Sequence, residues 1–223
     1  MQAKRLDFYF DYISPYAYFS WRKIRDFCAD HNLELILHPV VFGKLLDHWG
    51  QLGPAEVPPK RKWLMSYCIR YAKQHGFQFV GPKKHPFNTL TALRLSLPEV
   101  CSQEQMRIAD TIFTASWAQG KDLGDRNELI DALNAADFDG EALVRDTESS
   151  TIKDLLKKST ADAIERGVFG VPTVIIDDQL FWGNDQFEHM AMHLNGEDGV
   201  SEELLKKVLK RERGIDRKAL SSS

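Results

Sequence analysis

The chain begins with hydrophobic and polar residues in alternation. Residues 6–11 read LDFYFD, and a period of two is typical of a strand with one face on a core. Ser14 and Pro15 follow and indicate a helix start, because serine can cap free backbone N–H groups and proline suits the first helical position. Apolar residues at helical spacing continue this helix to about His31, and a second alternating run at 33–39 predicts another strand. The opening of the chain therefore predicts a βαβ unit.

Between Gly43 and about Gly167 the hydrophobic residues recur with the period of a helix instead. A capping residue followed three positions later by glutamine or glutamate marks a helix start, and this pair occurs at Ser102 and again at Asp125. No convincing strand pattern interrupts the segment. We therefore expect a block made only of helices.

Strand signals return after this block. Residues 173–182 hold a β-branched run, two consecutive aspartates and a Leu-Phe-Trp segment, which together predict a hairpin. Asn184 and Asp185 can then cap a helix that continues to about Leu194. The order is βαβ, helical block, ββα, so the block is predicted to be an insertion in an α/β fold. A charged helix is predicted from Ser201, followed by a serine-rich end.

Composition narrows the possible partners. The chain has 223 residues, 43% of them hydrophobic, which is enough to bury a core without a metal or a disulfide. Its 29 basic and 32 acidic residues are interspersed and leave a net charge of -3, so we expect no nucleic-acid partner and no membrane partner. No apolar run approaches the roughly 20 residues that span a bilayer. The strand pattern starts so early that no secretion signal fits before it, and we expect a cytoplasmic protein.

Cysteines and histidines form no redox or metal motif. Cys28, Cys68 and Cys101 stand far apart and outside any CxxC, which favours reduced, buried thiols. The 7 histidines show no metal-ligand spacing, and no glycine-rich phosphate loop follows a strand. We therefore expect neither a metal nor a nucleotide cofactor.

The peptide bond before one proline can affect whether the adjacent backbone is able to bind a ligand. Pro172 begins the second β segment within GVFGVPT, residues 167–173. An ordinary trans proline here would stop a helix, whereas a cis proline would turn the preceding backbone N–H and C=O toward an extended peptide. The segment by itself leaves both open.

Four segments together resemble a known family. They are DFYFDYISPYAY from Asp7, GQLGPAEVPPKR from Gly50, FGVPT from Phe169 and FWGND from Phe181. In combination, from Asp7 to about Leu194, they are similar to the 2-hydroxychromene-2-carboxylate isomerases, relatives of the kappa-class glutathione transferases. The resemblance implies a thioredoxin-like α/β fold of the disulfide-oxidase (DsbA) type and a homodimer.

The order of these patterns also predicts a division of the chain. Residues 1–42 and 168–200 would form a discontinuous thioredoxin-like domain, 43–167 a helical insertion domain, and 201–223 a C-terminal helix and tail. Redox members of this fold start the first helix with CxxC. This chain has Ser14 there, and serine forms no disulfide, so thiol–disulfide exchange by the protein itself is excluded.

Glutathione is the cofactor that the family implies, and Ser14 is the implied catalytic residue. A helix N-terminus carries free N–H donors and a partial positive charge, so it stabilises a thiolate, and a serine hydroxyl can add a hydrogen bond. A plain N-cap role is the alternative, and one hydroxyl can serve both. Further glutathione-binding residues implied by the family are Lys44, Gln51, Leu52, Lys62, Val171, Pro172, Gly183, Asn184 and Asp185.

These residues would divide the tripeptide among them. Val171 would pair with the backbone of its cysteine, Asp185 would accept the γ-glutamyl ammonium, and Asn184 would hold the neighbouring carboxylate. A basic residue would meet the glycine carboxylate. For that contact the sequence leaves open Lys44, Lys60, Arg61 and Lys62.

The implied substrate is a small aromatic acid. Candidates for an aromatic wall, which can instead be core residues, are Tyr16, Phe42, His48, Trp49, Trp63 and Phe87. The predicted function is glutathione-dependent cis–trans isomerisation of 2-hydroxychromene-2-carboxylate, or of a related acid from aromatic degradation, by reversible thiolate addition. Two alternatives stay open. One is a kappa-like transferase or peroxidase acting on another electrophile, and the other is a non-enzymatic thioredoxin-like module that binds peptides at the proline loop.

Overall fold

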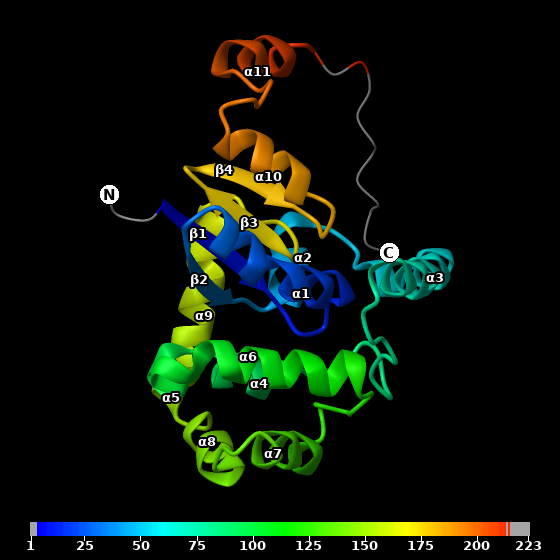
Figure 1. Ribbon diagram of the computed structural model, residues 1–223, viewed down its shortest axis with the longest axis vertical. Coiled ribbons are helices and arrows are strands. Elements are labelled where there is room, and N and C mark those ends of the chain that lie inside the picture. Colours follow the sequence, from blue (N-terminus) through cyan, green and yellow to red (C-terminus); the bar gives the residue numbers. More distant parts are fainter. Residues whose placement is uncertain (1–3, 213, 215–223) are drawn as a thin grey trace, which may run out of the picture. The chain divides into compact units, whose positions relative to one another are not determined.

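Four strands form one sheet with the order β2-β1-β3-β4 (Figure 1). In this computed structural model, which describes residues 4–212 and 214, the strands are β1 (Lys4–Phe10), β2 (Leu33–Pro39), β3 (Thr173–Ile176) and β4 (Gln179–Trp182). β2 runs parallel to β1, whereas β3 is antiparallel to both β1 and β4. The chain divides into two compact units, Met1–Phe187 and Glu188–Ser223, and the sheet belongs to the first.

The β1–α1–β2 unit forms as the hydrophobic patterns predict. Helix α1 (Pro15–Asp30) begins directly after Ser14, whose hydroxyl accepts a hydrogen bond from the Ala17 N–H at 3.2 Å. The buried face of α1 packs on the sheet, where the rings of Trp21 and Phe8 stack with centroids 6.4 Å apart. This packing fixes Ser14 at the point where the chain leaves β1.

The segment between β2 and β3 contains only helices as regular elements (Figure 1), and it is described throughout. The α-helices are α2 (Phe42–Trp49), α3 (Pro58–His75), α4 (Leu90–Leu95), α5 (Pro98–Cys101), α6 (Gln105–Phe113), α7 (Arg126–Asn134), α8 (Gly140–Asp146) and α9 (Ser150–Glu165). The helical period read from the sequence is therefore confirmed. Where the domain boundaries lie within the chain stays a prediction.

Of the two predicted capping pairs, one is confirmed and one is wrong. Asp125 caps α7 and accepts a hydrogen bond from the Glu128 N–H at 3.2 Å. Ser102 does not cap α6, because its φ of 51° places it in the left-handed region and α6 begins only at Gln105. The Gln105 side chain instead donates to the Ser96 carbonyl at 2.6 Å. This is a contact with another helix end, which the local pattern does not contain.

The predicted hairpin is also present. Asp177 and Asp178 form its turn with φ values of 48° and 63°, a conformation that aspartate tolerates and that suits a two-residue hairpin. The following helix, α10 (Phe187–Leu194), begins two residues after Asp185, so the prediction that Asn184 or Asp185 caps it is wrong. Asn184 is buried, and its side-chain amide donates to the Tyr67 hydroxyl at 3.0 Å instead.

The second unit contains most of α10 and the helix α11 (Glu202–Leu209). Ser201 caps α11, accepting a hydrogen bond from the Leu204 N–H at 3.1 Å. Residues 1–3, 213 and 215–223 lie outside the described part of the chain, and the predicted serine-rich end is among them. No helix in the described ranges is long and apolar enough to cross a membrane.

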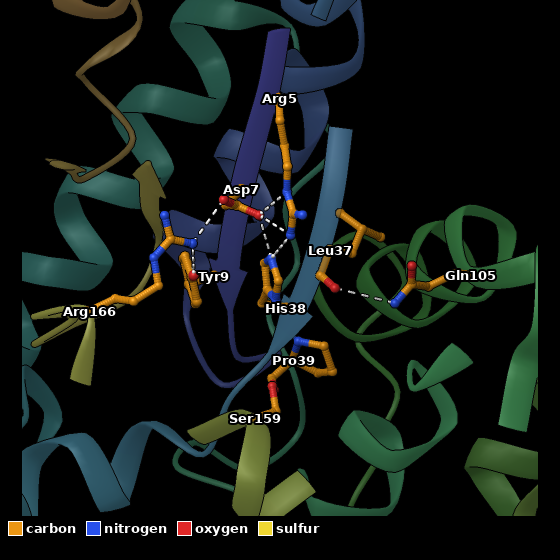
Figure 2. A network of polar contacts seen from close by, with 9 residues as sticks. All are labelled: Arg5, Asp7, Tyr9, Leu37, His38, Pro39, Gln105, Ser159 and Arg166. Atoms are coloured by element: carbon orange, nitrogen blue, oxygen red, sulfur yellow. Dashed lines mark hydrogen bonds and ion pairs between the residues drawn. The ribbon is translucent and has the colours of Figure 1, made fainter. Parts of the chain in front are cut away.

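A polar network at β1 and β2 joins the sheet to the end of α9 (Figure 2). Asp7 is 5% exposed and accepts hydrogen bonds from Arg5 Nε at 2.8 Å, His38 Nε2 at 2.6 Å and Arg166 Nη1 at 2.8 Å. Arg166 also donates to the Tyr9 hydroxyl at 2.6 Å. Burial by itself raises the pKa of Asp7, but the hydrogen bonds from His38, Arg166 and Arg5 outweigh it and hold that pKa well below its usual range.

Candidate active site

A cavity of about 610 Å³ opens at the N-terminus of α1, within the first unit. Its walls come from the turn at Ile13–Tyr16, from α2 and the loop after it, from the start of α3, from the turn at His85–Pro86, and from the loop before β3 with Trp182. Most of the lining side chains are apolar or aromatic, with few polar groups among them. This composition is typical of a site for a small molecule.

Ser14 lines this cavity opposite the proline loop. Its hydroxyl accepts a hydrogen bond from the Ala17 N–H at 3.2 Å and donates one to the Val171 carbonyl at 3.3 Å. Val171 lines the cavity too, and its peptide bond to Pro172 is cis. The structure therefore brings together Ser14 and Val171, which are far apart in sequence, at a helix N-terminus that favours an anion.

A buried carboxylate holds the turn that presents Ser14. Asp11 is 2% exposed, and it accepts hydrogen bonds from the N–H groups of Ile13 at 3.1 Å and Phe42 at 2.9 Å. Burial raises the pKa of Asp11 to about 6, although both hydrogen bonds favour the charged form. Asp11 thus links the Ser14 turn to the first residue of α2. Nothing in the sequence pattern distinguishes Asp11 from Asp7, the aspartate within β1.

Two aromatic residues from the helical segment hold the same turn. The Trp117 indole donates to the Tyr12 carbonyl at 2.9 Å, and His85 Nε2 donates to the Ile13 carbonyl at 3.0 Å. A carbonyl only accepts, so Nε2 carries a proton. Burial lowers the pKa of His85, which leaves a neutral ring whose Nδ1 is buried with no hydrogen-bond partner among the described residues. His85 also lines the cavity, and the sequence analysis does not single it out.

The structure places six predicted site residues in the cavity lining, namely Ser14, Tyr16, Phe42, Gln51, Leu52 and Val171. The other predicted residues lie outside the lining, namely Lys44, His48, Trp49, Lys62, Pro172, Gly183, Asn184 and Asp185. Trp63 and Phe87 are outside it as well.

Helix α2 explains part of this division. It turns Phe42 and, one helical turn later, Leu46 toward the cavity, while Lys44 and His48 lie on another face. The Trp49 indole donates to the Val168 carbonyl at 3.0 Å. His48 and Trp49 therefore do not form a wall of this cavity.

One of the four basic residues that the sequence leaves open lines the cavity. Lys60, on the first turn of α3, is part of the lining, whereas Lys44, Arg61 and Lys62 are not. Arg61 donates to the His85 carbonyl at 3.2 Å, and Lys44 pairs with an aspartate one turn away on α2. Lys60 is therefore the lysine positioned to meet an anionic ligand in this cavity.

The segment after β4 is tied to the proline loop without lining the cavity. The Gly183 N–H donates to the Pro172 carbonyl at 3.0 Å, and Gly183 has a φ of 117°. The Asp185 carboxylate accepts a hydrogen bond from the Gln186 amide at 3.0 Å. Asp185 also contributes to a raised pKa at Tyr16, which does line the cavity, so the two side chains are electrostatic neighbours.

Two aromatic residues that the sequence analysis does not name as wall residues do line the cavity. The rings of Phe169 and Trp182 meet edge to face with centroids 5.1 Å apart, and Trp182 is 53% exposed. Gly170 makes room for this arrangement, because a Cβ there would lie 2.6 Å from Trp182 Nε1. The proximity of a glycine to a tryptophan on the neighbouring strand leaves no periodic signal in the sequence.

Two kinds of side chain bear on metal and thiol chemistry in the described part of the chain, namely possible metal ligands and cysteines. In residues 4–212 and 214, no group of three histidine, cysteine, aspartate or glutamate side chains is arranged to hold a metal ion. The three cysteines are free and buried. Burial raises the pKa of Cys28 and Cys68 to about 12 and that of Cys101 to about 11, so all three are protonated thiols at neutral pH.

Comparison with known proteins agrees with this architecture. Residues 5–195 match the DSBA-like thioredoxin domain. The chain belongs to this family. It is also 30% identical over 198 residues to a 2-hydroxychromene-2-carboxylate isomerase of Sphingobium xenophagum, across 86% of this chain and 98% of that protein. The resemblance seen in the four sequence segments is therefore confirmed.

The chain is also similar to a glutathione S-transferase and to a solved isomerase structure. It is 25% identical over 203 residues to glutathione S-transferase kappa 2 of Caenorhabditis elegans, across 84% of this chain and 90% of that protein. A solved structure of a 2-hydroxychromene-2-carboxylate isomerase superposes with a TM-score of 0.78 at 22% identity, covering 92% of this chain and 98% of the other. The DsbA-like thioredoxin fold is therefore confirmed, and the relatives are isomerase and glutathione S-transferase enzymes.

Proposed function

We propose that the protein is a glutathione-dependent cis–trans isomerase of 2-hydroxychromene-2-carboxylate or of a related acid from aromatic degradation. One observation carries the proposal. Ser14 lies at the N-terminus of α1 and lines a largely apolar cavity, and its hydroxyl donates a hydrogen bond to the Val171 carbonyl. This combination offers an anion site beside a backbone group that can pair with a peptide. The relationship to an enzyme named as this isomerase supplies the reaction class.

The donor set of the cavity fits a thiol tripeptide. Ser14 and the free N–H groups of α1 suit a sulfur anion, and the Val171 carbonyl suits a peptide N–H. Lys60 suits a terminal carboxylate. Asp185 stays our candidate for the γ-glutamyl ammonium, since its carboxylate influences Tyr16 in the cavity wall. These residues would hold glutathione through groups of the chemical type that each end of the tripeptide requires.

When bound, glutathione would supply a thiolate for reversible addition: the C–S bond would form as the cis double bond becomes single, and after rotation the thiolate would leave with the C–S electron pair as the double bond returns. The chain itself contributes in other ways. The N-terminus of α1 favours the ionised over the protonated thiol, and a lower thiol pKa leaves more nucleophile at neutral pH. The cavity would hold the two reactants near each other. Because the cofactor would be regenerated, it would be needed only in catalytic amounts.

Ser14 and Val171 can respond to a ligand together. The Ser14 hydroxyl has one proton, and this proton is directed to the Val171 carbonyl at 3.3 Å. A peptide N–H that donates to the same carbonyl can take the place of that hydrogen bond. The Ser14 hydroxyl would then be free to rotate toward the sulfur while it still accepts from the Ala17 N–H.

The aromatic wall suits a flat acid. Tyr16, Phe42, Phe169 and Trp182 all line the cavity, and aromatic side chains favour stacking with a conjugated ring. The substrate wall that we propose therefore differs from the one expected from the sequence, since Phe169 and Trp182 take the place of His48 and Trp49.

The test is conversion of 2-hydroxychromene-2-carboxylate with and without glutathione, with identification of the product. We expect conversion only when glutathione is present, and Ser14→Ala should lower kcat/KM at least about tenfold, the cost of a hydrogen bond to a charged group. Ser149→Ala is the matched control. Ser149 caps α9 with the same geometry, accepting from the Ile152 N–H at 3.2 Å away from the cavity, so this variant should keep its activity.

Three results would reject the proposal. Conversion that does not depend on glutathione would remove the cofactor from the reaction. Turnover of chlorodinitrobenzene or of an organic hydroperoxide, without turnover of the chromene acid, would indicate a kappa-like transferase or peroxidase instead. No binding of glutathione at millimolar concentration would indicate the peptide-binding module.

A further inference from the structure

Two residues that carry hydroxyl groups line the cavity, and they differ in what their hydroxyl protons bond to. Ser14 and Tyr16 both line the cavity and are two residues apart on the first turn of α1. The Ser14 hydroxyl proton is donated to the Val171 carbonyl. For Ser14 to donate to a ligand, this hydrogen bond has to break first. The Tyr16 hydroxyl carries no such cost.

Tyr16 differs from every other tyrosine of the chain. The chain has 6 tyrosines, and all of them lie within the described residues. The hydroxyl groups of the other five each form a hydrogen bond. The pairs are Tyr9 with Arg166, Tyr12 with Ser96, Tyr18 with the Gln78 carbonyl, Tyr67 with the Asn184 side chain and Tyr71 with the Asn184 carbonyl. The Tyr16 hydroxyl forms none with any residue that the structure describes, although the side chain is half-buried. The Tyr16 phenol therefore keeps a proton that a ligand in the cavity could accept.

The Tyr16 ring is held in place from the side. It packs edge-on against the Tyr67 ring with centroids 5.5 Å apart, and Tyr67 in turn is held by the Asn184 amide at 3.0 Å. The orientation of the hydroxyl is therefore set by packing before any ligand binds. A donor that is already oriented loses little conformational entropy when it forms its hydrogen bond.

The Tyr16 hydroxyl stays protonated at neutral pH. Burial raises its pKa, and the nearby Cys68, Tyr67 and Asp185 raise it further. Tyr16 can therefore act as a hydrogen-bond donor to an anion but not as a base or a nucleophile. A hydrogen-bond donor suits a sulfur anion, because a thiolate can only accept hydrogen bonds.

We propose that Tyr16 is a second catalytic residue, whose hydroxyl donates a hydrogen bond to the sulfur anion of bound glutathione beside the Ser14 hydroxyl. The inference rests on the proposed function, because it requires glutathione in the cavity. It assigns the aromatic residue of the Ser-Pro-Tyr turn to thiolate stabilisation, in addition to its place in the substrate wall. With Tyr16 as donor, the thiolate is stabilised even while Ser14 remains bonded to Val171.

The test is Tyr16→Phe, which keeps the ring and removes only the hydroxyl. Tyr18→Phe is the matched control, because Tyr18 is on the same helix turn and its hydroxyl already donates to the Gln78 carbonyl at 2.6 Å. The thiol of bound glutathione is titrated by its ultraviolet thiolate absorbance. We expect the pKa of the bound thiol to rise by about one pH unit in Tyr16→Phe, a tenfold change in ionisation, and to stay unchanged in Tyr18→Phe.

A second ligand separates a contact with sulfur from other roles of the hydroxyl. S-methylglutathione has the same backbone but no ionisable thiol. We expect Tyr16→Phe to weaken binding of glutathione at a pH where the wild type holds the thiolate, and to leave binding of S-methylglutathione within twofold of the wild type. An equal loss for both ligands would show that Tyr16 contacts the peptide or shapes the cavity, and would overturn the proposal.

The remaining outcomes are also decisive. An unchanged thiol pKa in Tyr16→Phe, in a protein whose wild type binds glutathione with a lowered thiol pKa, would overturn the role of Tyr16 and leave the proposed function standing. A wild type that does not bind glutathione would overturn both. The thermal unfolding temperature of Tyr16→Phe, measured in parallel, shows whether the variant is folded.

Discussion

The network around Asp7 gives a quantitative prediction for stability. Asp7→Asn keeps the size of the side chain and removes the charge that faces Arg5, His38 and Arg166 (Figure 2). Removing one partner of a buried ion pair costs about 3–5 kcal/mol. The side chains of Arg5 and Arg166 are 55% and 37% exposed, so water can replace part of what they lose. We therefore expect Asp7→Asn to lower the free energy of unfolding at pH 7 by about 2–3 kcal/mol.

The pH dependence of this difference has a definite sign. The pKa of Asp7 is depressed in the folded state, so its contribution is fully present above the unfolded pKa of about 4 and is lost as the pH falls below it. The asparagine variant has no such group. The gap between wild type and variant should therefore shrink by about 1 kcal/mol between pH 7 and pH 3.

Urea unfolding followed by circular dichroism at pH 7, 5 and 3 measures both quantities. Glu148→Gln is the control, because Glu148 forms an exposed ion pair with Arg126 and should change stability by less than about 0.5 kcal/mol. A loss below about 0.5 kcal/mol for Asp7→Asn at pH 7, or a gap that does not change down to pH 3, would refute the reasoning.

Three further predictions concern the site. The Asp11 carboxyl, followed by carbon NMR with Asp11→Asn as the reference, should titrate near pH 6. Because its pKa is raised on folding, the wild type should lose stability relative to the variant as the pH rises from about 4 to 6. A titration near pH 4 would contradict this. Lys60→Met should weaken glutathione binding about fivefold, measured by calorimetry, whereas Lys73→Met on the same helix should not, and equal effects would remove Lys60 from the site. Gly170→Ala should displace Trp182 and raise KM for the aromatic acid with little change in stability, and an unchanged KM would exclude Trp182 from the substrate wall.

The sequence predicted the order of the elements well, because the hydrophobic periods are local. The alternating run that begins at Leu6, the Ser-Pro start of α1 and the two aspartates of the hairpin turn each act within a few residues. The prediction failed at Ser102, where the Gln105 side chain donates to the Ser96 carbonyl and does not complete a capping pair. Local capping rules do not contain such tertiary contacts.

The candidate site was predictable where a family motif singles out a residue, as at the Ser-Pro start of α1 and at the residue before Pro172. Ser14 and Val171 were named from their segments, and the structure brings them together. His85, Phe169 and Trp182 could not be found in this way, because the sequence does not show that two loops and the end of β4 meet at one cavity. Residues of α2 were misplaced for a related reason: the composition of a helix indicates an aromatic cluster but not which face meets the cavity.

The central claim is that the first turn of α1 holds the sulfur anion of a bound thiol. A crystal structure of the protein soaked with glutathione tests it most directly. The account predicts the sulfur within hydrogen-bond distance of the Ser14 hydroxyl, with the cysteine backbone of the tripeptide paired to Val171. A tripeptide seated in the same cavity with its sulfur remote from Ser14, or bound elsewhere on the protein, would contradict it.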